Sequence, residues 1–244
     1  MGDAVFCHPR LAAVYDPLDP DRSDLDAYAA LVDELGARSI LDLGCGTGTL
    51  ACRLARTGTE VTAVDPATAS LEVARQKPGA DRVRWLATEA GCLPPLQVDL
   101  VTMTGNVAQV FLTDAEWLST LLAVRAALRP GGHLAFEVRE PAREAWRTWN
   151  RAASHRRVEI PEVGTVETWV DLTDLDLPDV SFRWTFVFEA DGSVLTSDST
   201  LRFRSRAEVV DSLDSAGLVL QEVRDAPDRP GRELVFMARR PRDA

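Results

Sequence analysis

A regular alternation of short apolar runs with segments of helical spacing constrains the fold of this chain more than any other feature. The apolar runs lie at residues 39–43, 60–64, 82–87, 99–103 and 133–138, and the helical segments at 49–57, 67–77 and 114–128. Strands that alternate with helices are joined by right-handed crossovers and build a parallel sheet. We therefore predict an α/β fold of the doubly wound type, a three-layer sandwich with helices on both faces of a sheet.

The C-terminal half departs from this alternation and then returns to it. Three β-rich runs follow residue 140, at about 164–171, 180–189 and 193–204, and a hairpin turn at 190–192 separates the last two. A helix at 206–215 and strands at 218–224 and 233–239 complete the chain, and the short connection between these strands predicts an antiparallel hairpin. We expect a mostly parallel seven-stranded sheet with an antiparallel edge hairpin and a small β-rich insertion.

Composition argues against several classes of protein. The 244 residues are 45% hydrophobic and 27% charged, which is ordinary for a globular domain. No stretch approaches the roughly 20 apolar residues that span a bilayer, and no apolar signal sequence opens the chain, so we expect a cytoplasmic protein without a membrane partner. The net charge of -11 argues against nucleic acid as a partner. Arg202, Arg204 and Arg206 alternate, which indicates a local basic patch or, as we favour, a solvated strand face.

The turn after the first predicted strand is rich in glycine. Gly44, Gly46 and Gly48 stand at alternate positions behind Asp42. Ligands of doubly wound sheets lie in the crevice beyond the carboxyl ends of the strands, and glycine lets the backbone approach them closely. The dinucleotide fingerprint needs its third glycine at position 49, where this chain has Thr49. The spacing therefore favours a ligand other than NAD.

A second acidic residue ends the next strand. Asp65 lies 17 residues beyond Gly48, where a carboxylate accepts hydrogen bonds from the hydroxyls of a ribose. Its alternative role is the N-cap of a helix beginning at Pro66, because Asp followed by Pro is a favoured helix start. The two roles are compatible.

Residues 42–48 together with Asp65 resemble the signature of class I S-adenosylmethionine-dependent methyltransferases. The similarity continues at 87–94, 98–101 and 128–132, covers roughly residues 35–140 and resumes weakly at 206–220. It implies S-adenosyl-L-methionine as the cofactor, with Glu89 meeting the adenine amino group beside the Ala90 amide. The family more often has Asp where this chain has Glu89. The matched turns also assign Cys45 and Pro66 to the cofactor site.

For Asp42 two roles stay open: a buried acid that bonds loop amides, or a contact of the methionine ammonium group. At the end of the fourth strand the resemblance places Thr104, Gly105 and Asn106 near the sulfonium and the acceptor. The metal-binding carboxylate of catechol-type members is absent from this turn, and so is the Asn/Asp-Pro-Pro-Tyr/Phe motif of enzymes that methylate nucleic-acid bases. We therefore predict a metal-independent transfer to N or O of a small molecule.

Methyl transfer from a sulfonium is an in-line displacement, which needs proximity, alignment and exclusion of water, and a base where the acceptor must lose a proton. Glu137 ends the fifth strand and either accepts that proton or forms a salt bridge with Arg139 or Arg143. Asn106 either orients the acceptor or caps a loop. His8 is the third catalytic candidate.

His8 precedes residues 10–16, which in similar enzymes fold over the cofactor. Tyr15 in this segment either shields the sulfonium by a cation–π contact or packs ordinarily. The single domain of residues 1–244 is thereby divided into an N-terminal cap, a cofactor-binding core, a substrate-covering insertion and a C-terminal part of the core, at 1–35, 36–140, 141–205 and 206–244.

The tryptophans of the insertion either line an apolar acceptor pocket or form the insertion's own core: Trp146, Trp149, Trp169 and Trp184. The expected partner is a small-molecule methyl acceptor, and we allow for a homodimer. Two other functions stay open. One is a non-catalytic S-adenosylmethionine-binding regulatory protein, and the other is an NAD(P)-dependent oxidoreductase, which the glycine spacing disfavours.

Overall fold

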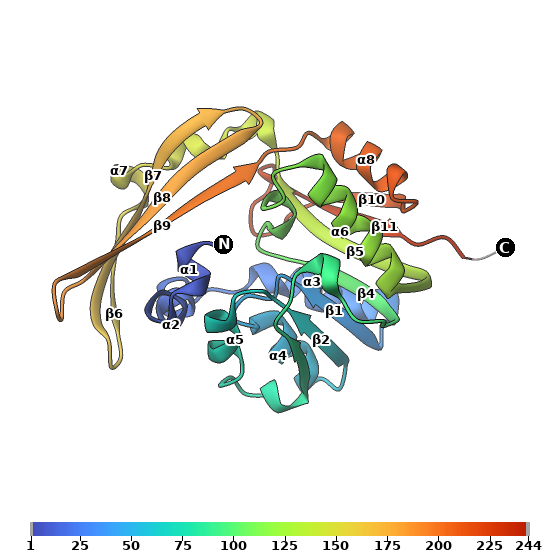
Figure 1. The fold of residues 1–244 in the computed structure, drawn as a ribbon, viewed down its shortest axis with the longest axis horizontal. Coiled ribbons are helices and arrows are strands. Elements are labelled where there is room, and N and C mark those ends of the chain that lie inside the picture. Colours follow the sequence, from blue (N-terminus) through green and yellow to red (C-terminus); the bar gives the residue numbers. More distant parts are fainter. Residues whose placement is uncertain (1, 243–244) are drawn as a thin grey trace.

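The computed structural model describes residues 2–242 and contains two sheets (Figure 1). The larger sheet has seven strands in the order β10-β11-β5-β4-β1-β2-β3. Strand β11 runs antiparallel between β5 and β10, whereas the pairs from β5 to β3 are parallel. The predicted seven-stranded sheet with its edge hairpin is therefore confirmed. Its strands are β1 (Ser39–Leu43), β2 (Glu60–Val64), β3 (Val83–Leu86), β4 (Val98–Met103), β5 (Leu128–Arg139), β10 (Val219–Asp225) and β11 (Glu233–Arg239).

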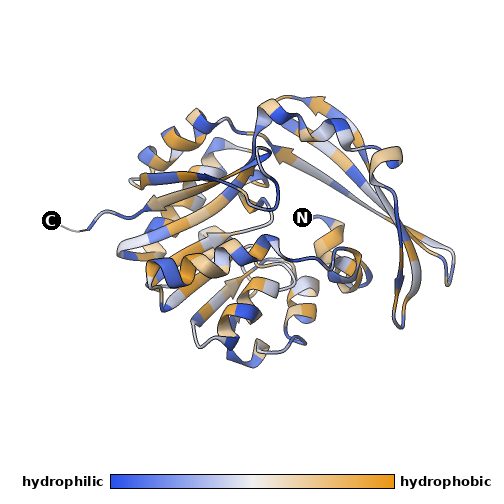
Figure 2. Ribbon diagram, turned by 180° about the vertical axis from the view of Figure 1, so that it is seen from behind, coloured by the Kyte–Doolittle hydropathy of each residue, from blue (hydrophilic) through white to orange (hydrophobic). Residues whose placement is uncertain are grey.

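Helices cover both faces of this sheet because successive side chains of a strand point to opposite sides. Ile40 packs against α3 and α4, whereas its neighbour Leu41 packs against α6 and α8. Strand β1 is buried along its whole length, as expected for a central strand with two covered faces. Figure 2 shows apolar residues along the core strands and on the helices packed against them. The core helices are α3 (Asp24–Leu35), α4 (Thr49–Arg56), α5 (Thr68–Ala74), α6 (Asp114–Ala127) and α8 (Arg206–Ser215).

The smaller sheet is formed by the insertion and is antiparallel throughout, in the order β6-β7-β8-β9. The turn at 190–192 joins β8 to β9, as predicted. Strand β6 was not predicted, and β7 runs five residues beyond the predicted end at residue 171. The strands are β6 (Arg156–Ile160), β7 (Gly164–Asp176), β8 (Asp179–Phe188) and β9 (Ser193–Arg202), with the short helix α7 (Arg151–Ser154) before them.

Two N-terminal helices, α1 (Ala4–Cys7) and α2 (Pro9–Leu18), lie between the smaller sheet and the core (Figure 1). Helix α1 contacts β9 and α5, and α2 contacts β6 and α5. Short 3-10 turns complete the described chain, at Ala80–Arg82, Ala90–Cys92, Val107–Gln109, Pro141–Arg143 and Ala145–Thr148. Within residues 2–242, none of the helices has the length and apolar character needed to cross a membrane.

Candidate active site

The glycine loop joins β1 to α4, and its three glycines all have a positive φ: 73° at Gly44, 51° at Gly46 and 72° at Gly48. A Cβ on Gly44 would lie 2.5 Å from a methyl of Val107, and one on Gly48 would lie 2.5 Å from the ring of Trp85. A Cβ on Gly46 would meet nothing within 4 Å. Gly44 and Gly48 are thus required by internal packing, whereas Gly46 is the glycine whose backbone faces open space.

Asp65 lies beside this loop at the end of β2. Its Oδ2 accepts a hydrogen bond from the Gly46 amide at 2.8 Å, and its Oδ1 accepts one from the Ala67 amide at 2.8 Å. Burial raises the pKa of Asp65, while the two amides lower it. Helix α5 begins at Thr68, so the N-cap role for a helix starting at Pro66 is wrong as stated. The carboxylate instead ties the turn after β2 to the glycine loop.

Asp42 is fully enclosed beneath the loop. Its Oδ1 accepts a hydrogen bond from the Thr102 hydroxyl on β4 at 3.0 Å. Of the two roles left open for Asp42, the structure therefore has the buried acid, with a strand hydroxyl as its partner in place of the loop amides. Burial raises the pKa of Asp42 to about 7.

Cys45 lies in the glycine loop and is half-exposed. Its amide donates a hydrogen bond to the Val64 carbonyl at 3.1 Å. Burial raises the pKa of its thiol well above the usual value.

The other predicted cofactor residues lie at the same edge of the sheet. Pro66 follows β2 and is exposed, Glu89 and Ala90 follow β3 as an exposed and a half-buried residue, and the half-buried Thr104 follows β4. Because the carboxyl ends of parallel strands meet at one edge, these residues lie along the same edge of the sheet as the glycine loop.

Glu137, at the end of β5, holds the turn after β4. Its Oε1 accepts hydrogen bonds from the Gly105 amide at 2.7 Å and the Asn106 amide at 3.1 Å. Its Oε2 accepts one from the Tyr28 hydroxyl on α3 at 2.6 Å. Burial raises the pKa of Glu137, and these hydrogen bonds lower it. The side chain is therefore fully engaged by two backbone amides and one phenol.

The expected alternative for Glu137, a salt bridge with Arg139 or Arg143, is wrong. Across residues 2–242, Glu137 has no cationic group within 4.0 Å. Arg139 Nε lies 3.4 Å from Glu233 Oε1, and Arg229 Nη1 lies 2.6 Å from the same oxygen. Glu233, on β11, therefore forms salt bridges with both Arg139 and Arg229.

Asn106 is 3% exposed and has a left-handed backbone, with φ 63°. Its Nδ2 lies 3.5 Å from Glu233 Oε1, and its buried Oδ1 has no hydrogen-bond partner among the described residues. A buried polar atom without a partner is uncommon in folded proteins. Asn106 is thus the predicted catalytic residue that retains an unused acceptor.

His8 and Tyr15 lie on the N-terminal helices. His8 is exposed and caps α2, because its Nδ1 accepts a hydrogen bond from the Arg10 amide at 3.2 Å. The Tyr15 ring lies 5.5 Å from the ring of Phe6. Desolvation raises the pKa of the Tyr15 hydroxyl, although 36% of the residue is exposed.

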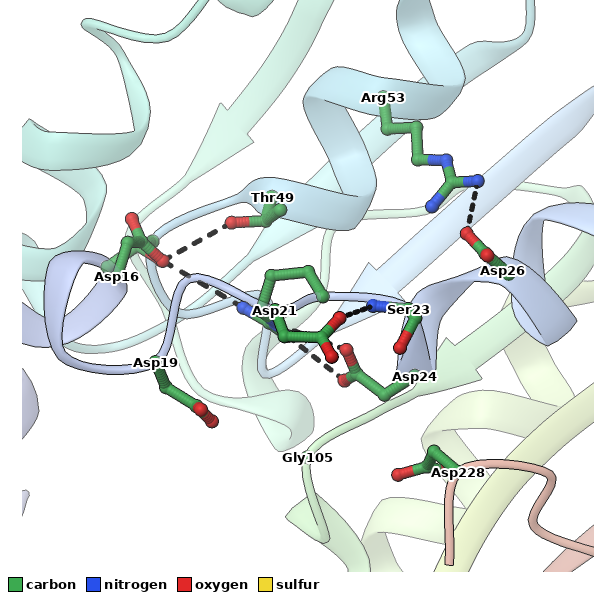
Figure 3. A network of polar contacts seen from close by, with 12 residues as sticks. Asp16, Asp19, Asp21, Ser23, Asp24, Asp26, Thr49, Arg53, Gly105 and Asp228 are labelled. Atoms are coloured by element: carbon green, nitrogen blue, oxygen red, sulfur yellow. Dashed lines mark hydrogen bonds and ion pairs between the residues drawn. The ribbon is translucent and has the colours of Figure 1, made fainter.

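Asp16, next to Tyr15, was not predicted and makes the strongest contact between α2 and the glycine loop. Its Oδ1 accepts a hydrogen bond from the Thr47 hydroxyl at 2.8 Å, and its Oδ2 lies 2.6 Å from Lys77 Nζ. Figure 3 shows Asp16 beside Thr49 at the start of α4. Lys77 is the only lysine of the chain, but no sequence pattern linked it to Asp16.

The arginines at 202 and 204 form neither a basic patch nor a solvated strand face. Arg204 is 4% exposed, and its Nη2 donates to the carbonyls of Phe111 at 2.8 Å and Thr113 at 3.3 Å. Arg202 Nη1 donates to the Leu112 carbonyl at 2.8 Å. The two side chains therefore connect residues 111–113, which follow β4, to the C-terminal end of the insertion by hydrogen bonds.

The tryptophans of the insertion divide between its core and its surface. Trp146 is buried in a cluster with Phe182 and Phe203, as expected for an insertion with a core of its own. A hollow of about 510 Å³ is lined by Trp146 and Trp149. Trp169 instead points outward, with Arg151 over its ring at 4.0 Å.

Residues 40–132 match the family model for a methyltransferase domain. A cypemycin N-terminal methyltransferase from Streptomyces sp is 32% identical over 119 residues, which cover 48% of this chain and 49% of that protein. The chain therefore spans about half the length of this relative.

Solved structures resemble this one over nearly the whole chain. The CcbJ methyltransferase from Streptomyces caelestis has a TM-score of 0.76 at 24% identity and covers 95% of this chain and 96% of its own. The sugar N-methyltransferase KedS8 from Streptoalloteichus sp has a TM-score of 0.74 at 20% identity and covers 93% of this chain and 91% of its own. At these identities the likeness concerns the fold, and its extent includes the insertion.

Proposed function

We propose that this chain is a class I S-adenosylmethionine-dependent methyltransferase that transfers the methyl group of this cofactor to a nitrogen or oxygen atom of a small molecule, without a metal ion. The match of residues 40–132 to the model of a methyltransferase domain supports the proposal. The observation that carries the proposal is the contact between the glycine loop after β1 and the turn after β2 at the edge of the sheet. The Gly46 amide lies 2.8 Å from Asp65 Oδ2, and the missing side chain of Gly46 leaves open space. Bare backbone beside a carboxylate fits an adenosyl donor, whose sugar presents hydroxyls and whose other end is an amino acid.

The same edge supplies the other contacts that we assign to the cofactor. Residues 44–48 hold the amino-acid end, Asp65 the ribose, and Glu89 with the Ala90 amide the adenine. Thr104 and Gly105 would border the methyl group, and Tyr15 would cover it from α2. When bound, the cofactor supplies an already activated methyl group, so the chain has to align the acceptor and exclude water.

The state of the candidate bases favours nitrogen over oxygen as the methylated atom. Glu137 is engaged by three hydrogen bonds, and His8 caps a helix. A neutral amine attacks without a base, because its proton leaves the product ammonium group after the displacement, whereas an alcohol has to lose its proton during the attack. We assign Glu137 to positioning the Gly105–Asn106 turn, and the Asn106 Oδ1 to accepting a hydrogen bond from the acceptor.

The relatives support a small-molecule amine as well. KedS8 is a sugar N-methyltransferase, and the cypemycin enzyme methylates an N-terminus.

Calorimetry with S-adenosylmethionine, S-adenosylhomocysteine and NADH tests the cofactor assignment. We expect binding of the first two only, and binding of NADH alone would favour the oxidoreductase. Formation of S-adenosylhomocysteine is then measured with matched panels of small amines and phenols, each with and without EDTA. Turnover with amines that EDTA leaves unchanged supports the proposal, whereas cofactor binding without turnover in either panel favours the regulatory protein. The cytoplasmic location and the homodimer stay predictions for cell fractionation and light scattering.

A further inference from the structure

One carboxylate joins three segments that are far apart in the sequence. Asp16 on α2 accepts a hydrogen bond from Thr47 in the glycine loop at 2.8 Å and pairs with Lys77, just beyond α5, at 2.6 Å. Lys77 Nζ also donates to the hydroxyl of Thr49, the first residue of α4, at 2.7 Å. Both threonine hydroxyls next to the loop glycines are therefore fixed by this ion pair.

The ion pair of Asp16 and Lys77 is half-buried. The side chains of Lys77 and Asp16 are 21% and 24% exposed, and Thr47 is buried. Asp26 and Arg53 also join the N-terminal segment to α4 at 2.6 Å, but their side chains are 64% and 43% exposed (Figure 3). Exposed ion pairs contribute little, so the half-buried pair of Asp16 and Lys77 should contribute more than that of Asp26 and Arg53. Arg22 Nη1 also lies 3.8 Å from Asp16 Oδ1, so Asp16 keeps one more distant cation when Lys77 is removed, whereas Lys77 has no second carboxylate within 4.0 Å among the described residues.

The opposite side of the N-terminal cap is attached to the smaller sheet. The Val5 amide donates to the Ser197 hydroxyl at 2.9 Å, and Arg10 pairs with Asp191 at 2.8 Å. The cap therefore spans from β9 to the glycine loop, and Asp16 is its attachment at the loop.

We propose that Asp16 is a positioning residue for the cofactor: its ion pair with Lys77 clamps the glycine loop to the N-terminal cap, so that the loop and the cap hold and release the cofactor together. This inference rests on the proposed function, because the site is that of S-adenosylmethionine. Asp16 itself acts through Thr47, Thr49 and Lys77.

The test compares Asp16→Asn and Lys77→Met with Lys77→Arg and with the matched control Asp26→Asn. Association and dissociation of S-adenosylmethionine are measured together with hydrogen exchange of the cofactor-free protein. Asp16→Asn and Lys77→Met should weaken binding roughly tenfold, mainly through faster dissociation, as expected for a hydrogen-bonded charge. Lys77→Arg, which keeps the charge, should restore most of the affinity, and Asp26→Asn should bind as the wild type does.

Hydrogen exchange separates clamping from a merely structural role. In Asp16→Asn, amides of both α2 and residues 44–49 should exchange faster, while those of β4 and β5 keep their rates. Unchanged dissociation in a folded Asp16→Asn protein overturns the inference, and so does a protected glycine loop beneath a loosened α2. If Asp16→Asn fails to fold, a Lys77→Arg protein that binds as weakly as Lys77→Met overturns it instead. Failure of the wild type to bind S-adenosylmethionine defeats the proposed function, and hydrogen exchange then still decides whether Asp16 clamps the loop.

Discussion

Alanine at Gly46 or at Gly48 should separate cofactor contact from internal packing. Both positions have a left-handed backbone, with φ 51° and 72°, so any side chain costs about 1–2 kcal/mol at either one. At Gly48 the new methyl would also lie 2.5 Å from Trp85 and 2.8 Å from Ala74, and such overpacking adds about 1–3 kcal/mol. The expected loss of unfolding free energy is therefore about 1–2 kcal/mol for Gly46→Ala and roughly 2–5 kcal/mol for Gly48→Ala.

Urea unfolding at equilibrium measures this difference, and calorimetry measures the binding of S-adenosylmethionine. Because the methyl of Gly46→Ala enters the space assigned to the cofactor, binding should weaken by roughly tenfold or more while the protein stays folded. Gly46→Val should abolish binding. Equal destabilisation by the two alanines would refute the packing role of Gly48, and wild-type affinity in Gly46→Ala would refute the assignment of Gly46 to the cofactor.

Three further outcomes follow from single side chains. Asp65→Ala should weaken cofactor binding by about 1–3 kcal/mol, because the ribose loses a charged acceptor, and unchanged affinity by calorimetry would exclude that contact. Burial raises the pKa of Asp42 from 3.8 to about 7, so its contribution to stability is present at low pH and is lost as the pH rises from about 4 to about 7. Asp42→Asn should therefore gain stability relative to the wild type across that range, on the order of 4 kcal/mol, and a pH-independent difference in urea unfolding would contradict the raised pKa. Arg204→Met, which removes the hydrogen-bond donor of the Phe111 carbonyl, should lose about 1–3 kcal/mol, whereas the exposed Arg206→Met should change stability by at most about 0.5 kcal/mol, and similar losses would show that the buried contacts contribute nothing.

The core was predictable because its strands are buried on both faces. Such strands need continuous apolar runs in the sequence. When these runs are separated by helical segments, few sheet topologies are possible. The ends of the elements were less accurate. Helix α5 stops at Ala74, three residues before the predicted end. The Lys77 amide bonds the Ala74 carbonyl three residues back, and Pro78 disfavours a helical conformation at Lys77.

The elements of the cap and the insertion that were missed depend on tertiary contacts. Helix α1 has four residues, too few to be stable alone, and its Val5 is buried against the smaller sheet. Strand β6 is mostly polar and exposed, so no apolar alternation marked it, and its pairing with β7 supplies its backbone hydrogen bonds.

The partners of the site acids were beyond prediction for a related reason. Thr102 lies 60 residues from Asp42, and Tyr28 lies 109 residues from Glu137. A local sequence motif predicts which residue types border the crevice. It does not predict a hydrogen-bonding hydroxyl on an element that is distant in the sequence. Asp42 and Glu137 nevertheless share one arrangement: each lies on a core strand, accepts a hydroxyl hydrogen bond from another element and has a pKa raised by burial.

This arrangement follows from the chemistry that we propose. A sulfonium donor is already activated, so the rate depends on how well the acceptor and the methyl group are aligned, and an exposed acid or base adds little. Buried carboxylates suit that task, because an acid that accepts several hydrogen bonds fixes the turns around it more firmly than a solvated one. If an amine is the acceptor, a Tyr28→Phe variant should keep its cofactor affinity while its turnover falls. The reason is that Glu137 loses one of three contacts and the Gly105–Asn106 turn loosens beside the methyl group. A fall in cofactor affinity with unchanged turnover would instead place Glu137 in the cofactor site.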